Sequence, residues 1–88
     1  LTGTIKISMS EWPKDKKERI FKVFKFKNYR QSFAFVTQIA MLAEKKNHHP
    51  EIILDYGKVT VSLISHDVNA ITQRDLDLAN QIDKLYNK

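Results

Sequence analysis

The segment from Ile52 to Leu63 constrains the fold most strongly, because apolar residues recur at every second position on both sides of a glycine. A period of two is typical of a strand with one buried face. Gly57-Lys58 predicts a two-residue turn between two such strands. The register that places the apolar residues on one face pairs Tyr56 with Val59, Leu54 with Val61 and Ile52 with Leu63.

The rest of the chain predicts two further strands and two helices. Thr4–Ser8 alternates weakly and Arg19–Lys27 is rich in β-branched and aromatic residues, so both are expected to be strands. Apolar residues recur at helical spacing in two runs, which begin with capping patterns at Asn28 and Thr72. The order strand, strand, helix, strand, strand, helix predicts an α+β fold with a four-stranded antiparallel sheet and helices on one face.

Length and composition indicate a single globular domain. With 88 residues, the chain has room for one domain, residues 1–88, and a thin core. Cysteine is absent, which excludes disulfides and thiolate metal sites. No apolar run is long enough to cross a bilayer, and no signal pattern opens the chain. We therefore expect a soluble cytoplasmic protein without a membrane partner; a nuclear location stays open.

The net charge of +5 raises the question of nucleic acid binding. The lysines are dispersed along the chain, which indicates a solvated surface rather than one basic stripe. Phe33-Ala34-Phe35-Val36 resembles part of the aromatic motif of an RNA-binding RRM domain. It lies in a helical pattern, however, whereas an RRM needs its rings on a strand for bases to stack. Nucleic acid is therefore not expected as a partner.

Three histidines, His48, His49 and His66, are the candidate catalytic residues. Carried to the open end of the hairpin, the register above pairs His49 with His66, which places their Cβ atoms about 4.5 to 5.5 Å apart. Pro50 is expected to disturb the ladder there, so proximity is the firmer part of this prediction. Imidazole exchanges protons near neutral pH, and the elimination of water requires both an acid and a base.

Two other interpretations of the histidines stay open at this point. They could simply end a helix and a strand, because a hairpin brings many residues together without function. Three histidines could also hold a catalytic zinc ion. Adjacent histidines such as His48 and His49 seldom converge on one ion, and no H-E-x-x-H motif is present. No metal or organic cofactor is therefore expected.

The histidines belong to a wider pattern. The run Ala43–Glu51, with the sequence A-E-K-K-N-H-H-P-E, is followed by Ser65-His66-Asp67 and by Arg74-Asp75. From Trp12 onward this pattern resembles the pterin-4a-carbinolamine dehydratase family. The resemblance implies an enzyme of tetrahydrobiopterin recycling that converts 4a-hydroxytetrahydropterin to quinonoid dihydropterin and water, without a cofactor.

The resemblance also implies roles for individual residues. His48 and His66 would act as the main acid-base residues, and His49 would help to hold the pterin. The hairpin register instead favours His49 as the residue that faces His66. Five further residues would support the site: Glu44, Pro50, Asp67, Arg74 and Asp75. Asp75 has a second interpretation as the acid of a helix capping box, and Glu44 and Arg74 could be surface charges.

Partners follow from the same resemblance. Family members form homodimers and homotetramers, and some stabilise the dimer of a transcription factor, so a protein-interaction role is the alternative function. Leu78, Ile82 and Tyr86 are candidates for an oligomer interface or for a core stripe. Members usually carry a helix before the first strand. This chain opens with Leu1 and strand-like residues, so we expect that an N-terminal helix is missing.

Overall fold

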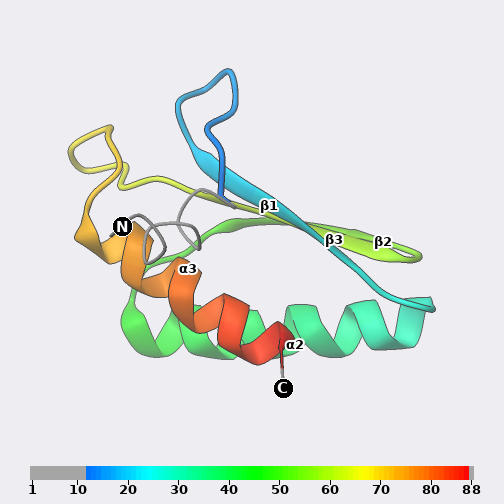
Figure 1. Cartoon of the computed structure of the whole chain (residues 1–88). Coiled ribbons are helices and arrows are strands. Elements are labelled where there is room, and N and C mark those ends of the chain that lie inside the picture. The colour runs from blue at the N-terminus through cyan, green and yellow to red at the C-terminus, as the bar shows by residue number, and fades with distance from the viewer. Residues whose placement is uncertain (1–11, 88) are drawn as a thin grey trace, which may run out of the picture.

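The computed structural model describes residues 12–87. They form an antiparallel sheet whose strand order is β1-β3-β2, with two helices on one of its faces (Figure 1). The α+β class is therefore confirmed. The elements are β1 (Ile20–Lys25), α2 (Tyr29–Lys46), β2 (Glu51–Asp55), β3 (Lys58–Leu63) and α3 (Gln73–Tyr86).

The prediction of four strands is not met by the described residues, which contain three in the order strand, helix, strand, strand, helix. The expected strand Thr4–Ser8 lies outside the described residues. The polar stretch before β1 folds back on that strand. Phe21 donates its backbone N–H to Pro13 O at 2.9 Å, and an isolated bridge joins Lys14 to Ile20.

Helix α2 begins and ends as its sequence indicates. The side chain of Asn28 accepts a hydrogen bond from the Gln31 backbone N–H at 2.9 Å, which satisfies one of the free donors of the first turn. The helix ends at Asn47, which adopts the left-handed conformation with φ 55°. Asparagine tolerates this conformation better than most residues, and it turns the chain toward His48.

The hairpin forms as expected, but its register differs from the prediction. Leu54 lies opposite Val59 and Ile52 lies opposite Val61, so the predicted pairing is wrong by two residues. Side chains alternate with a period of two, and a shift of two residues therefore preserves their faces. Val59 and Val61 are accordingly buried on the core side, as the alternation predicts.

The turn explains the error in register. Its residues are Tyr56 and Gly57 rather than Gly57 and Lys58. Gly57 does not adopt a positive φ, so the turn type is not the reason for the glycine. Phe26 donates its N–H to Gly57 O at 2.8 Å, and a Cβ atom on Gly57 would lie only 3.1 Å from Phe26 O. The glycine allows this close approach of two backbone segments.

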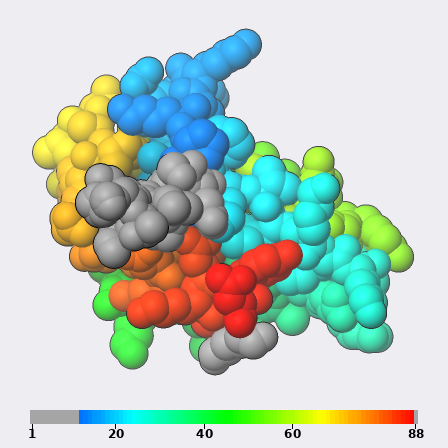
Figure 2. Space-filling view, viewed as in Figure 1, coloured from blue at the N-terminus to red at the C-terminus, as the bar shows by residue number. Residues whose placement is uncertain are grey.

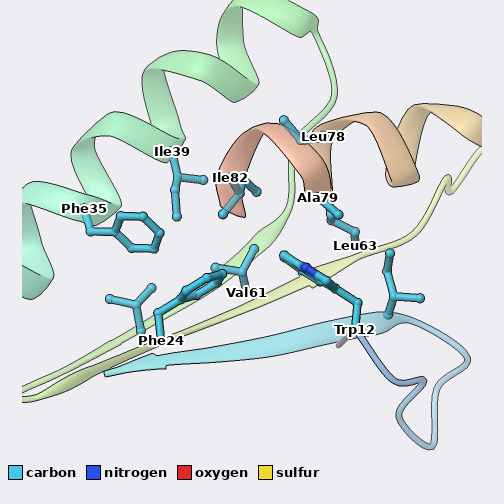
Figure 3. Packing of buried hydrophobic residues seen from close by; sticks show 11 residues of the cluster. Trp12, Phe24, Phe35, Ile39, Val61, Leu63, Leu78, Ala79 and Ile82 are labelled. Carbon is cyan, nitrogen blue, oxygen red and sulfur yellow. The ribbon is translucent and has the colours of Figure 1, made fainter. Parts of the chain in front are cut away.

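The core lies between the sheet and the two helices. Figure 3 shows side chains from both layers meeting there: Phe24, Val61 and Leu63 from the sheet, Phe35 and Ile39 from α2, and Leu78, Ala79 and Ile82 from α3. Trp12 closes one end of the core and donates its indole N–H to Asp83 at 3.1 Å. Within residues 12–87, no helix combines the length and apolar character needed to cross a membrane.

Two of the three interface candidates belong to this core. Leu78 and Ile82 are 2% and 0% exposed, so neither is available to a partner. Tyr86 is 39% exposed and donates its hydroxyl to Lys25 O at 3.0 Å. The apolar stripe of α3 therefore packs mainly within the protomer.

Candidate active site

The end of α2, the segment after β3 and the start of α3 meet at one end of the molecule (Figure 1). A cavity of about 320 Å³ opens there. It brings together all three histidines and two of the charged residues singled out from the sequence. Its walls consist of Asn47, His48, His49, Ile64, His66, Asp67 and Arg74.

The expected cross-strand pair of His49 with His66 is wrong. Strand β2 begins only at Glu51, because Pro50 has no N–H for the ladder, and β3 ends at Leu63. In the observed register, position 49 would in any case fall opposite position 64. The two histidines therefore reach the same cavity from irregular segments.

His48 is held by a buried carboxylate. Its Nε2 atom lies 2.6 Å from Asp75 Oδ1, and the two side chains are 12% and 0% exposed. His48 follows the left-handed residue that ends α2, and Asp75 lies in the first turn of α3. The contact therefore ties the two helices together at the wall of the cavity.

The other carboxylate oxygen of Asp75 caps α3. Asp75 Oδ2 accepts hydrogen bonds from the Thr72 backbone N–H at 2.9 Å and from the Ser65 hydroxyl at 2.7 Å. Because the Ser65 hydroxyl proton is used in the bond to Asp75, the Thr72 hydroxyl donates to Ser65 Oγ at 2.7 Å. The capping interpretation of Asp75 is confirmed. Its complete burial means that it can reach a ligand only through His48.

These hydrogen bonds determine the ionisation of Asp75. Burial alone would raise the pKa of Asp75, because it disfavours the charged form. Hydrogen bonds from the Thr72 backbone, His48 and Ser65 outweigh burial and hold the pKa below its ordinary value of 3.8. The carboxylate is therefore ionised at neutral pH and accepts a hydrogen bond from His48 Nε2–H.

The second histidine has a more exposed setting. His49 Nε2 lies 3.0 Å from Glu44 Oε1, and their side chains are 57% and 82% exposed. Glu44 belongs to the last turns of α2, while Pro50 follows His49 and immediately precedes β2. Glu44 thus contacts the site through His49, and Pro50 ends the segment that carries both histidines.

An exposed ion pair forms another part of the wall. Arg74 donates to Asp67 Oδ1 at 2.7 Å. This hydrogen bond, with the attraction between the two charges, lowers the pKa of Asp67 and raises that of Arg74 against the smaller effect of desolvation. The ion pair joins the segment after β3 to the first turn of α3. His66 lies next to Asp67 in that segment.

Ser65 and Thr72 belong to the site although the sequence pattern does not predict them there. Ser65 is 1% exposed, and with Thr72 it completes the hydrogen bonding around Asp75. The position of Ser65 beside His66 was the available signal, but serine lies mostly at the surface of proteins. Among the described residues, no group of three or more histidine and acidic side chains has an arrangement that could hold a metal ion.

Comparison with known proteins gives consistent matches. The family model described as "Pterin 4 alpha carbinolamine dehydratase" matches residues 3–85. A relative from Picosynechococcus sp. is 42% identical over 88 residues, covering 97% of this chain and 96% of its own. One from Sinorhizobium fredii is 46% identical over 65 residues, covering 74% of this chain and 62% of its own. Both are described as "Putative pterin-4-alpha-carbinolamine dehydratase".

Two solved structures share the fold. A transcriptional coactivator/pterin dehydratase from Brucella melitensis superposes with a TM-score of 0.82 at 32% identity, covering 98% of this chain and 96% of its own. A pterin dehydratase-like protein, identified as a RuBisCO assembly factor in the alpha-carboxysome, has a TM-score of 0.74 at 27% identity and covers 86% and 89%. On the match of residues 3–85, the chain belongs to the pterin 4 alpha carbinolamine dehydratase family.

Proposed function

We propose that the chain catalyses the dehydration of 4a-hydroxytetrahydropterin to quinonoid dihydropterin and water. The observation that carries this proposal is the cavity of about 320 Å³ whose wall contains His48, His49 and His66. In the reaction the C4a–oxygen bond breaks, the hydroxyl leaves as water with a proton from an acid, and a base takes a proton from a pterin ring nitrogen. Two imidazoles at one cavity can supply both groups.

His48 is the better candidate for the base. Its Nε2–H donates to the ionised Asp75 at 2.6 Å, so in neutral imidazole the other nitrogen, Nδ1, carries no proton. The carboxylate also stabilises the positive imidazolium that forms when Nδ1 accepts the substrate's proton. The buried partner therefore selects both the tautomer and the orientation that a base requires.

His66 is the candidate acid. It lines the same cavity, is exposed, and its ring has no hydrogen-bond or ion-pair partner within residues 12–87. An exposed imidazole can exchange protons with solvent and can donate one to the departing hydroxyl. The two histidines thus differ in environment, which is how neighbouring groups of the same type acquire opposite roles.

The remaining residues support binding in this proposal. His49, held by Glu44 at 3.0 Å, can donate or accept a hydrogen bond at the edge of the pterin. Arg74 and Asp67 also line the cavity. Substrates of this kind carry several ring nitrogens and an oxygen, so a rim of polar side chains is suited to orienting them.

The proposal is tested by a direct assay on freshly generated 4a-hydroxytetrahydropterin, with the spontaneous rate subtracted. We expect dehydration in proportion to the protein concentration. A folded His48→Ala/His66→Ala double variant serves as the matched control, because it retains the rest of the cavity. A wild-type rate equal to the spontaneous rate, in protein with a native circular dichroism spectrum, would contradict the proposal.

A second candidate function is binding to another protein, and one surface favours it. Tyr29, Phe33 and Met41 are 51%, 57% and 71% exposed and are separated by four and eight residues along α2, so they lie on one side of the helix. A row of exposed apolar side chains is typical of an interaction surface. A second copy of the chain or a different protein would suit it. Sedimentation of Phe33→Lys/Met41→Lys beside wild type tests self-association, which the lysines should weaken.

A further inference from the structure

A second cavity, of about 330 Å³, shares His48 and Arg74 with the histidine cavity. Lys46 closes it on the side of α2. The rest of its wall comes from one face of α3, namely Asp77, Leu78, Asn80, Gln81 and Lys84. In Figure 2 the end of α2, in green, protrudes beside the start of α3, in orange. The proposed dehydration uses none of the residues that belong to this second cavity alone.

The charges around the second cavity are not balanced. Arg74 is already engaged with Asp67 at 2.7 Å, and Asp77 accepts a hydrogen bond from Gln73 at 2.9 Å. Lys46 and Lys84 also line the cavity. Neither ammonium group has a hydrogen-bond or ion-pair partner among residues 12–87. Asp77 keeps its negative charge, because the Gln73 amide is neutral. The wall nevertheless offers two free cations, together with the side-chain amides of Asn80 and Gln81 as further donors.

Helix dipoles account for only part of this arrangement. Lys46 and Lys84 each lie in the last turn of a helix, where a positive charge is favourable. Lys45 lies in the same last turn of α2 and has the same relation to the dipole, yet it does not line the cavity. The dipole does not require lysines from two different helices to border one cavity.

We propose that this second cavity binds an anionic group, phosphate or carboxylate, on the side chain of a pterin whose ring lies at the histidines. The inference rests on the proposed function and names its substrate class. A pterin ring is uncharged near neutral pH, so the lysines offer it little. His48 and Arg74 line both cavities, so one molecule can extend from the histidine cavity into the second cavity. Lysine ammonium groups then pair with the anion as mobile point charges.

Binding of stable aromatic pterins tests this inference without turnover. The probes are 6-hydroxymethylpterin and its phosphate monoester, titrated by calorimetry at low ionic strength. We expect the phosphate ester to bind about tenfold more tightly or better, since charge-assisted hydrogen bonds are the strong ones. Lys46→Gln/Lys84→Gln should remove that advantage and leave the affinity for the uncharged pterin unchanged. Lys27→Gln/Lys58→Gln, which removes the same charge from exposed positions, should preserve it.

Additional probes identify the source of the anion. Pteroylglutamate carries carboxylates, so tighter binding of pteroylglutamate than of 6-hydroxymethylpterin would support a carboxylate ligand. Tighter binding of the phosphate monoester alone would support a phosphate ester. Equal affinity for all three would overturn the inference, as would an equal loss in both double variants. Dehydration of an uncharged carbinolamine under those conditions would leave the proposed function intact. Failure of every pterin to bind, with no dehydration, would overturn both.

Discussion

The two carboxylate oxygens of Asp75 have different roles: Oδ1 lies 2.6 Å from His48 Nε2, and Oδ2 accepts the backbone N–H of Thr72 at 2.9 Å. One contact orients a histidine at the cavity, and the other caps α3. Because the carboxylate is completely buried, neither contact exchanges freely with water. The position of His48 and the first turn of α3 therefore depend on the same side chain.

The first prediction concerns the two proposed proton-transfer residues. His48→Ala and His66→Ala should each lower turnover by at least about tenfold, since a positioned acid or base contributes on the order of 10² to 10⁴ in rate. The double variant should lose less than the product of the single losses if the histidines act as a unit. Folded single variants with wild-type turnover and pterin affinity would rule out this site. His49→Ala should mainly weaken pterin binding, measured as a higher KM.

The second prediction concerns Asp75 as the positioning residue of His48. Asp75→Asn removes the negative charge and allows the amide to present N–H to His48, which selects the wrong tautomer. We expect kcat to fall by about tenfold or more, with a smaller change in KM. The substitution should add little further loss in a His48→Ala background, because the base is then already absent. Losses that multiply in the double variant would contradict a role through His48.

The third prediction follows from the lowered pKa of Asp75. Its folded pKa lies below the ordinary value of 3.8, so the ionised carboxylate stabilises the fold above about pH 4. That contribution should disappear as the pH falls through the folded pKa. Urea denaturation should show that Asp75→Asn is less stable than wild type at pH 7, and that the difference shrinks below pH 4. A difference independent of pH would contradict this assignment.

The fourth prediction compares two valines on opposite faces of the sheet. Val61 is 0% exposed, whereas Val23 is 39% exposed. Val61→Asp buries an unpaired carboxylate at a cost of several kcal/mol and should prevent folding. Val23→Asp should reduce the free energy of unfolding by about 1 kcal/mol or less. Circular dichroism and urea titration of both variants provide the comparison, and equal tolerance would show that the faces are misassigned.

The fifth prediction concerns metal independence. The proposed chemistry uses imidazoles alone, so exhaustive treatment with EDTA should leave the dehydration rate unchanged. Loss of activity on chelation, with recovery after adding zinc, would favour the metal interpretation of the histidines instead.

The sequence predicted the faces of the hairpin better than its register. Apolar alternation identifies Val59 and Val61 as core residues in any register shifted by two, so it cannot distinguish those registers. The predicted register places Gly57 at the first position of the turn. Its true constraint is the approach of Phe26 O, a contact between segments far apart in the sequence. Such contacts leave no local pattern.

In the candidate site, too, local patterns predict some features and miss those that depend on contacts between distant segments. The run from Glu44 to Pro50 contains two of the histidines, the hairpin predicts that the third lies near them, and one cavity contains all three. The partner of His48 could not be derived from spacing, because Asp75 lies 27 positions away and its capping pattern already explained it. Ser65 was missed for a related reason, since its burial depends on how the chain after β3 meets α3.

The shared carboxylate of Asp75 also sets an order of events on heating. The first turn of a helix frays more readily than its interior, and here fraying withdraws the support of His48. Activity should therefore decline at temperatures where the sheet and the core remain intact. Thr72→Ala removes the hydroxyl that contacts Ser65 Oγ and so loosens only the beginning of α3. It would then behave as a catalytic defect although Thr72 lies outside the histidine cavity.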